Sequence, residues 1–422
     1  MVFKKIIDSN LIFGIIVTIF ILSSAVATSC RGGKDLKVGL FGVEQILQKK
    51  SPYENPLDPN RALFNYAPSF AILQYPFLLK SKMIAPFQFE NITPSILAWY
   101  GFEVLSLLIS ALILLRLIPS KSKETSLRNL KISFLMSIPL IGYELANGQN
   151  KLLALLFILI AVFLFEKNRM FLSAISFCLA LTVYIPLLAF IFYFILRSKG
   201  KFIFSFIVAV FVVFLLVPSF IFGIRFNLFL LKEWFMRSLK PFLFTNTYAT
   251  YIDLRGSSQS LPSAIGRIFV SGHTGAFVYL ISPSLVHIII KAFSSLILLF
   301  SCLAVWKSSK IISRGLCYAI FLTLALLLPK YCIFYTWSWL FALYFMVFNY
   351  ISYPDVPVFK KRILLTLTCI LLISSYLLGI HLLNHFSVLF WATLFLWGAM
   401  AIALIHGVAD SIYKKSRIST VD

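Results

Sequence analysis

The sequence has few charged residues and very few acidic ones. Asp, Glu, Lys and Arg make up 13% of the 422 residues and only 15 are acidic, whereas 60% are hydrophobic. Water-soluble domains carry about 25% charged and about 45–50% apolar residues. Too few polar residues are present to cover the apolar ones in water. The composition therefore excludes a soluble protein and predicts an integral membrane protein.

Several short catalytic and metal-binding motifs are also absent. The chain contains no Walker motif, no H-E-x-x-H and no G-x-S-x-G. Its six Cys show no C-x2-C spacing, and its five His do not cluster. The sequence therefore excludes ATP as the energy source and predicts no cofactor and no metal ligands, with any metal requirement left open.

What the chain does carry is a net charge of +23, arranged as short basic clusters between apolar runs. One such cluster contains Lys121, Lys123, Arg128 and Lys131. This pattern is typical of the positive-inside rule of membrane proteins. Because there is no long basic arm and no nucleic-acid-binding module, nucleic acid is not an expected partner.

The apolar runs predict an all-α polytopic protein with about 10–12 transmembrane helices, forming a single integral membrane domain over residues 1–422. The first run, 11–28, follows Lys4 and Lys5 and ends in Ala-Val-Ala-Thr. An uncleaved anchor and a cleaved leader are both compatible with it. Basic clusters then place both termini in the cytoplasm, 31–93 as a first external loop and 224–282 as a second external segment.

Two breaks are expected in the apolar runs. The tetrapeptide Asn147-Gly148-Gln149-Asn150 separates short crossings at about 132–147 and 150–165. The run 170–196 has Pro186 in its middle. It forms either two half-length helices broken near Pro186 or one continuous helix, and only the first satisfies the charge rule on both flanks.

Any active site is expected on the external side of the membrane, because nine of the acidic residues lie on that side or near the outer membrane face. Asp35 precedes a segment, 36–50, that is predicted to be an amphipathic helix on the outer leaflet. Its apolar face is expected to contain Leu36, Leu40, Val43 and Leu47. Asp35 is then either a general base toward an acceptor hydroxyl or simply a helix cap.

Three further features carry open alternatives. Glu103 and Glu144 lie within apolar runs near their outer ends, where an acid either faces a cavity or a partner, or reaches the interface. The stretch 69–79 is too short to span a membrane and predicts a re-entrant or interfacial helix. The basic residues of 224–282 suit a lipid phosphate or pyrophosphate, or else anionic headgroups.

Four features occur in a fixed order over residues 31–270. They are Asp35 with the following stretch to Pro52-Tyr53, then Tyr66-Ala67-Pro68, then Gly148-Gln149-Asn150, and lastly Ser258-Gln259-Ser260-Leu261 with Arg267. This order resembles the GT-C superfamily of polyprenyl-phosphate-sugar-dependent glycosyltransferases. More narrowly, it is similar to glycosyltransferase family 87, which includes the mycobacterial mannosyltransferase of phosphatidylinositol mannoside synthesis.

The resemblance implies a GT-C-like fold and an inverting hexosyl- or pentosyltransferase at the external face. Asp35 would be the general base, and the donor would be a sugar on a polyprenyl phosphate. The acceptor would be a lipid or a glycan. The expected location is the bacterial inner membrane, with a periplasmic or extracellular active site. The candidate substrate-binding residues are Tyr66, Gln149, Asn150, Arg255, Gln259, Ser260, Arg267 and Lys330.

Some stretches depart from the family pattern. Tyr184-Ile185-Pro186 lacks the Lys that often precedes this Pro, Ser258 stands where the motif has Asn, and Trp337-Ser338-Trp339 lacks a His. Two other functions stay open. An O-antigen ligase or polymerase would use a polyprenyl-pyrophosphate glycan with His273 and nearby Arg residues, and a lipid-linked oligosaccharide flippase would need charges lining a cavity.

Overall fold

The computed structural model describes residues 6–53, 64–78, 94–198, 200–240, 258–269, 282–308, 311–329, 332–377 and 387–418. Over these ranges the protein is built from helices, with no named strand and one isolated bridge, between Ser258 and Ile333. The prediction of an all-α protein is confirmed. The predicted binding residues Arg255 and Lys330, together with His273, lie outside the described residues.

Five helices in the described residues are long and apolar enough to cross a membrane. They are α2 (Asn10–Arg31), α5 (Pro94–Leu117), the run Phe202–Phe222, α15 (Pro283–Lys307) and α20 (Val388–Ile418). A sixth candidate is the pair α6 (Lys123–Asn147) and α7 (Lys151–Glu166), which bends by 114°. The polytopic prediction is therefore confirmed, while the count of 10–12 crossings stays a prediction.

The predicted break near Pro186 is present. Helix α8 (Met170–Val183) ends before an extended Tyr184, and the 3-10 helix η2 (Ile185–Ala189) leads into α9 (Phe190–Ser198). Proline disfavours helical geometry in the residue before it and offers no N–H to continue the helix. The half-length helices thus follow from the sequence, and whether the chain crosses back there stays a prediction.

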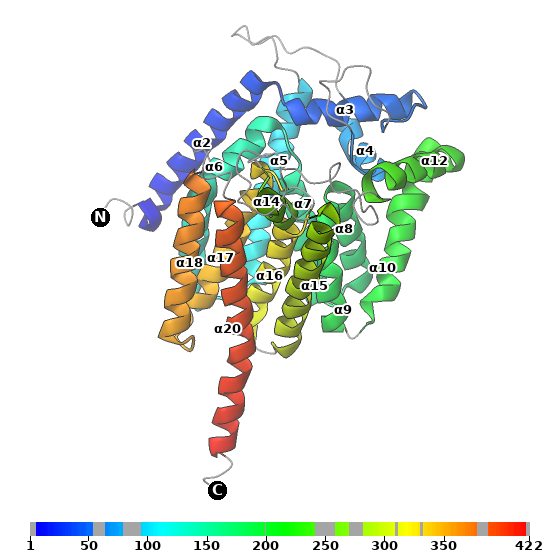
Figure 1. Cartoon of the computed structure of the whole chain (residues 1–422). Helices are drawn as coiled ribbons and strands as arrows, with labels where there is room; N and C mark the ends of the chain where they lie inside the picture. Colours follow the sequence, from blue (N-terminus) through cyan, green and yellow to red (C-terminus); the bar gives the residue numbers. More distant parts are fainter. Residues whose placement is uncertain are drawn as a thin grey trace. The chain divides into compact units, whose positions relative to one another are not determined.

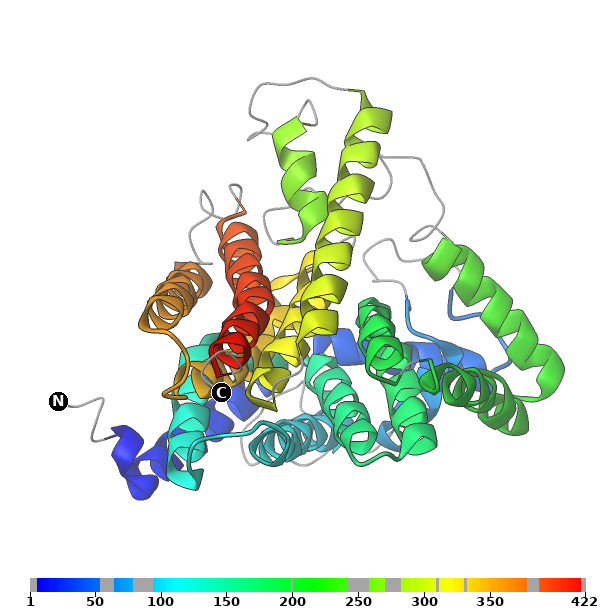
Figure 2. The same ribbon diagram turned by 90° about the horizontal axis from the view of Figure 1, so that it is seen from below.

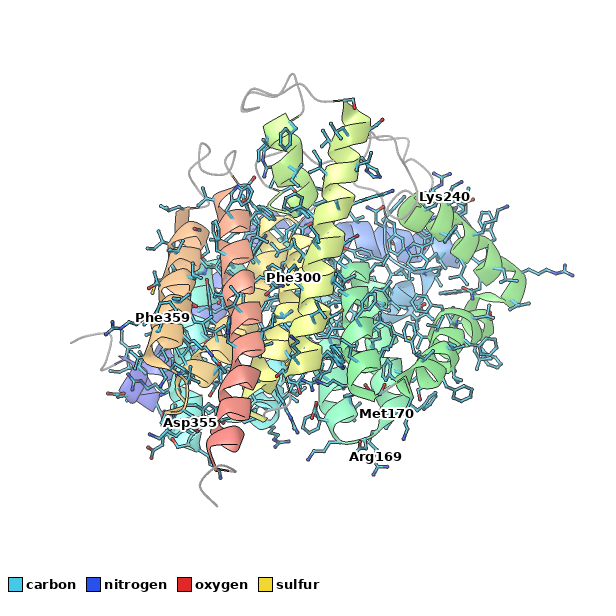
Figure 3. The ribbon with its side chains drawn as sticks, turned by 60° about the horizontal axis from the view of Figure 1, so that its bottom comes forward. Arg169, Met170, Lys240, Phe300, Asp355 and Phe359 are labelled. Atoms are coloured by element: carbon cyan, nitrogen blue, oxygen red, sulfur yellow. The ribbon has the colours of Figure 1, made fainter. Side chains whose placement is uncertain are left out.

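The chain divides into two compact units, which we describe separately. Unit 1 comprises Met1–Ile113, Ile138–Ile185 and Lys201–Thr245, and unit 2 comprises Leu114–Ser137, Pro186–Gly200 and Asn246–Asp422. Unit 1 contains α7 and α8, which contact each other and are seen nearly end-on in Figure 2. Figure 3 shows the exposed Arg169 at the turn that joins them.

Unit 2 is centred on two buried helices, α16 (Arg314–Leu327) and α17 (Leu340–Ile351). Helix α16 contacts α15 and α20, and α18 (Val358–Tyr376) contacts α17 and α20. Phe300 of α15 and Phe359 of α18, both labelled in Figure 3, are 49% and 73% exposed. Large exposed aromatic side chains on such helices fit a lipid-facing surface.

In unit 1, two helices run across the direction of α8 and α10 (Phe202–Val210), near one end of them (Figure 1). These are α3 (Lys34–Leu47) and α12 (Ile224–Trp234). Both contact the short helix α4 (Pro68–Gln74), which the 3-10 helix η1 (Tyr75–Phe77) extends. They enclose a core of Val43, Ile46, Tyr53, Phe64, Ala67, Ala71, Phe222, Leu230 and Trp234.

The amphipathic helix α3 is confirmed, but its predicted apolar face is partly wrong. Leu36, Val43 and Ile46 are buried within the protein, whereas Leu47 is 48% exposed. The helical spacing of apolar residues predicted that Leu47 lies on the buried face. Helix α4 instead packs on the side of α3 that carries Ile46. Attachment of α3 to the outer leaflet stays a prediction.

A proline weakens the helix that leads to α12. The π-helix η3 (Phe211–Leu216) precedes α11 (Val217–Phe222), which has Pro218 in its first turn. Since Pro218 has no N–H, the carbonyl of Phe214 four residues earlier loses its helical donor. The buried Asn227 replaces that donor, because its Nδ2 lies 3.1 Å from the Phe214 oxygen and 3.2 Å from the Leu215 oxygen.

We expect Asn227→Leu to destabilise unit 1 by about 1–3 kcal/mol, because a buried carbonyl then lacks a donor. Thermal unfolding in detergent measures the effect. The control Ser219→Ala removes only one of the contacts of Asn227, a hydroxyl 3.1 Å from Nδ2, and should shift the midpoint less. Equal midpoints for Asn227→Leu and wild type would contradict this assignment.

Candidate functional site

The candidate site begins at a corner between α2 and α3. Helix α2 ends at Arg31 and is capped by Gly32, and Gly32 and Gly33 both have positive φ angles, of 64° and 53°. Two successive left-handed residues turn the chain sharply from one helix into the next, and glycine accepts this conformation without a steric penalty. The corner places the half-buried Asp35 in the first turn of α3, where the helix dipole favours a carboxylate.

The opposite side of the site is the turn between α6 and α7. Gly148 has a φ of 65°, and its N–H donates to the carbonyl of Leu145 at 3.0 Å. The Gln149 N–H donates to the carbonyl of Glu144 at 3.3 Å. This pair of hydrogen bonds is the Schellman motif, which ends a helix with a left-handed residue.

The two corners touch each other. A Cβ atom on Gly148 would lie 3.2 Å from the Gly33 Cα and 3.2 Å from the Leu36 Cβ. The hydroxyl of Thr28, on the last turns of α2, also donates to the carbonyl of Leu145 at 2.9 Å. Glycine at position 148 is therefore required by close backbone approach as well as by its φ angle.

This contact brings Asp35 and Gln149 together. The side-chain Nε2 of Gln149 donates a hydrogen bond to Oδ2 of Asp35. Gln149 is 3% exposed, and its backbone carbonyl accepts from Nε1 of the buried Trp99 at 3.1 Å. Trp99 thus holds the main chain of Gln149, and the side-chain amide of Gln149 orients the carboxylate.

Next to this pair lies a buried lysine that the sequence analysis did not single out. The Nζ of Lys151 lies 3.3 Å from Oδ1 of Asn150, 4.5 Å from the ring centre of Tyr184 and 5.9 Å from that of Tyr66. An ammonium over an aromatic face is attracted by the ring quadrupole, more strongly when water is excluded. Tyr66 and Asn150 are therefore gathered around Lys151.

Glu103 and Glu144 are 1% and 0% exposed, so they do not reach the interface. Oε1 of Glu144 accepts the backbone N–H of Leu152 at 2.6 Å, in the first turn of α7. Glu103 interacts electrostatically with Glu144 and Lys151 and lies near the N–H of Leu153. Within the described residues, neither of its oxygens makes a well-aligned hydrogen bond. Glu144 thus faces a partner, as the first alternative predicted, and burial shows that Glu103 does not reach the interface either.

The remaining predicted residues form a second cluster, in unit 2. Arg267, on α14 (Leu261–Phe269), is 1% exposed and donates to the Ser258 carbonyl at 2.8 Å and to Ser387 Oγ at 3.1 Å. The Gln259 N–H donates to the carbonyl of Cys332 at 2.9 Å, and the Ser260 and Ser263 hydroxyls lie 3.0 Å apart. Arg267 therefore joins the stretch 258–269 to Ser387, and Gln259 joins the same stretch to Cys332. The role of Arg267 in a donor pocket stays a prediction.

The predicted site residues are thus divided between the two units, with Asp35, Tyr66, Gln149 and Asn150 in unit 1. Lys151, Tyr184 and Trp99 were not predicted as site residues from the sequence. A lysine that opens an apolar helix directly after a polar turn was the signal for Lys151. Within the described part of the chain, no group of three or more His, Cys, Asp or Glu side chains is placed to hold a metal ion.

Comparison with known proteins gives one family match. The model of the family described as Glycosyltransferase family 87 matches residues 64–329, which is more than half of the chain. This range includes Tyr66 and the turn with Gln149, and it begins after Asp35. No curated protein and no solved structure matches the chain.

Proposed function

This chain belongs to glycosyltransferase family 87, and from that premise we propose that it transfers a sugar from a polyprenyl phosphate to a lipid or glycan acceptor. It is a membrane glycosyltransferase. The sequence contains no Walker motif, which argues against ATP as the energy source. The family and the long apolar helices support a donor that is carried in the membrane. A mannosyl donor is the first candidate, with glucosyl and arabinosyl donors as its competitors.

The observation that carries the proposal is the hydrogen bond between Gln149 and Asp35. It joins a carboxylate in the first turn of α3 to the turn that ends α6. Asp35 is half-buried, so it is ordered by its neighbours and still reachable. A carboxylate in that position suits general-base catalysis.

In the proposed reaction, Asp35 accepts the proton of the acceptor hydroxyl as that oxygen attacks the anomeric carbon. The bond from this carbon to the phosphate oxygen breaks, and the polyprenyl phosphate leaves with the electron pair. A single displacement inverts the anomeric configuration. Gln149 fixes the orientation of the carboxylate, and Tyr66 and Asn150 line the sugar-binding side of the site.

The location proposed for this site is the external face of the bacterial inner membrane, with both chain ends in the cytoplasm. The positive-inside distribution of basic clusters supports this orientation. The protein would then meet its donor and acceptor directly from the membrane, which fits the long apolar helices of both units.

A donor panel tests the proposal. Purified protein in detergent micelles is given polyprenyl-phosphate mannose, glucose or arabinose, with a lipid extract as acceptor. We expect transfer from one of these monophosphates and none from a nucleotide sugar. Transfer only from a polyprenyl-pyrophosphate glycan would favour a ligase or polymerase, and movement of a lipid-linked glycan across proteoliposomes without bond formation would favour a flippase.

A further inference from the structure

The turn 147–150 connects two helices whose ends need hydrogen-bond partners, and Glu144 takes part in one hydrogen bond at each end. Its backbone carbonyl, in the last turn of α6, accepts the Gln149 N–H at 3.3 Å. Its side-chain oxygen accepts the Leu152 N–H at 2.6 Å, in the first turn of α7. Glu144 thus accepts hydrogen bonds from both flanks of the turn. The donors, Gln149 and Leu152, follow it by five and eight residues.

The helix end that Glu144 binds would otherwise be costly. The first N–H groups of a helix have no partner within it, and a buried one costs free energy. The residue in the N-cap position of α7 is Asn150, and it makes no side-chain capping hydrogen bond to the helix. Glu144 therefore supplies the cap from the preceding helix, and its negative charge also suits the positive end of the helix dipole.

Glu144 belongs to a buried group of charged side chains. Glu103 interacts electrostatically with both Glu144 and Lys151, and all three side chains are at most 7% exposed. Acids buried in a membrane protein are rare and usually face a partner with a function. Here the partner of Glu144 is the Leu152 N–H, and the lysine offsets part of the negative charge at the neighbouring Glu103.

We propose that Glu144 is a positioning residue: it holds the turn 147–150 so that the Gln149 amide meets Asp35. This rests on the proposed role of Asp35 as the base. Glu144 acts through the hydrogen bond to the Leu152 N–H, with its charge contributing less. It affects the rate of transfer and leaves the binding of donor essentially unchanged.

The first measurement is independent of any donor. Hydrogen–deuterium exchange is followed at the peptide covering 144–153 in wild type, Glu144→Ala and Glu144→Gln. Glu144→Ala should exchange faster at Leu152 and Gln149, whereas Glu144→Gln keeps an acceptor oxygen and should stay close to wild type. The control Glu124→Ala, at the exposed other end of α6, should change nothing.

The second measurement uses the donor that supports transfer. Glu144→Ala should lower kcat at least tenfold and up to about 100-fold, since small misplacements of catalytic groups have effects of this size. The donor KM should stay within about twofold, and Glu144→Gln should lose at most about fivefold in kcat. Unchanged exchange and kcat in Glu144→Ala, or an equal loss in both variants, would overturn the proposal. If wild type transfers from no donor, the proposed function fails and the exchange data alone decide on Glu144.

Discussion

Asp35→Asn should abolish sugar transfer while leaving the protein folded. Asparagine has nearly the same shape as aspartate, and its side-chain oxygen still accepts the hydrogen bond from Gln149. It cannot take up a proton from the acceptor hydroxyl at neutral pH. Because general-base catalysis contributes about 10²- to 10⁴-fold to a rate, we expect a loss in kcat of about that size. Initial transfer rates in detergent micelles measure it.

The matched control is Glu44→Gln, which makes the same chemical change in the same helix. Glu44 lies in α3, two and a half turns beyond Asp35, and is not fully buried. This variant should retain wild-type transfer. Full activity in Asp35→Asn, with an unchanged unfolding midpoint, would show that the base is another residue.

A second large effect is expected from Gly148→Ala. An alanine at a φ of 65° costs about 1–2 kcal/mol, and its methyl group would lie 3.2 Å from the Gly33 Cα. Backbone cannot move aside as a flexible side chain can, so the two corners should separate. We expect a lower unfolding midpoint and a loss of transfer of about tenfold or more, as Gln149 moves away from Asp35.

Another glycine of unit 1 serves as the comparison. Gly101, in α5, has no heavy atom within 4 Å of an added Cβ. Because alanine is the better helix former, Gly101→Ala should leave transfer unchanged and stabilise the protein by about 0.5–1 kcal/mol. A Gly148→Ala variant as stable and active as Gly101→Ala would mean that the two corners do not need their close contact.

Local signals in the sequence accounted for most of the helical framework. The apolar runs located the spans, and Pro186 located the break between α8 and α9, because its missing N–H acts wherever the residue occurs. The amphipathic helix after Asp35 was also predicted correctly. Its buried face was not, because helix α4 decides whether Leu47 or Ile46 is covered, and α4 is distant in sequence.

The candidate site was predictable only in part. The order of motifs named Asp35, Gln149 and Asn150, yet 114 residues separate the two partners of the Asp35–Gln149 hydrogen bond. Lys151 was missed because a single lysine beside a polar turn gives no periodic signal. The alternatives left open for Glu103 and Glu144 could be resolved only when their burial was known.

The sequence by itself determined that the protein lies in a membrane, where its helices begin and end, and which family it belongs to. Each of these depends on composition or on short-range patterns: an excess of apolar residues, helix breakers, and motifs in a fixed order. The tertiary structure alone decided that Gly33 and Gly148 meet, that Gln149 orients Asp35, and that Glu144 caps the helix after its own. These contacts join residues on different helices, and their distances follow from side-chain packing, which no local pattern encodes.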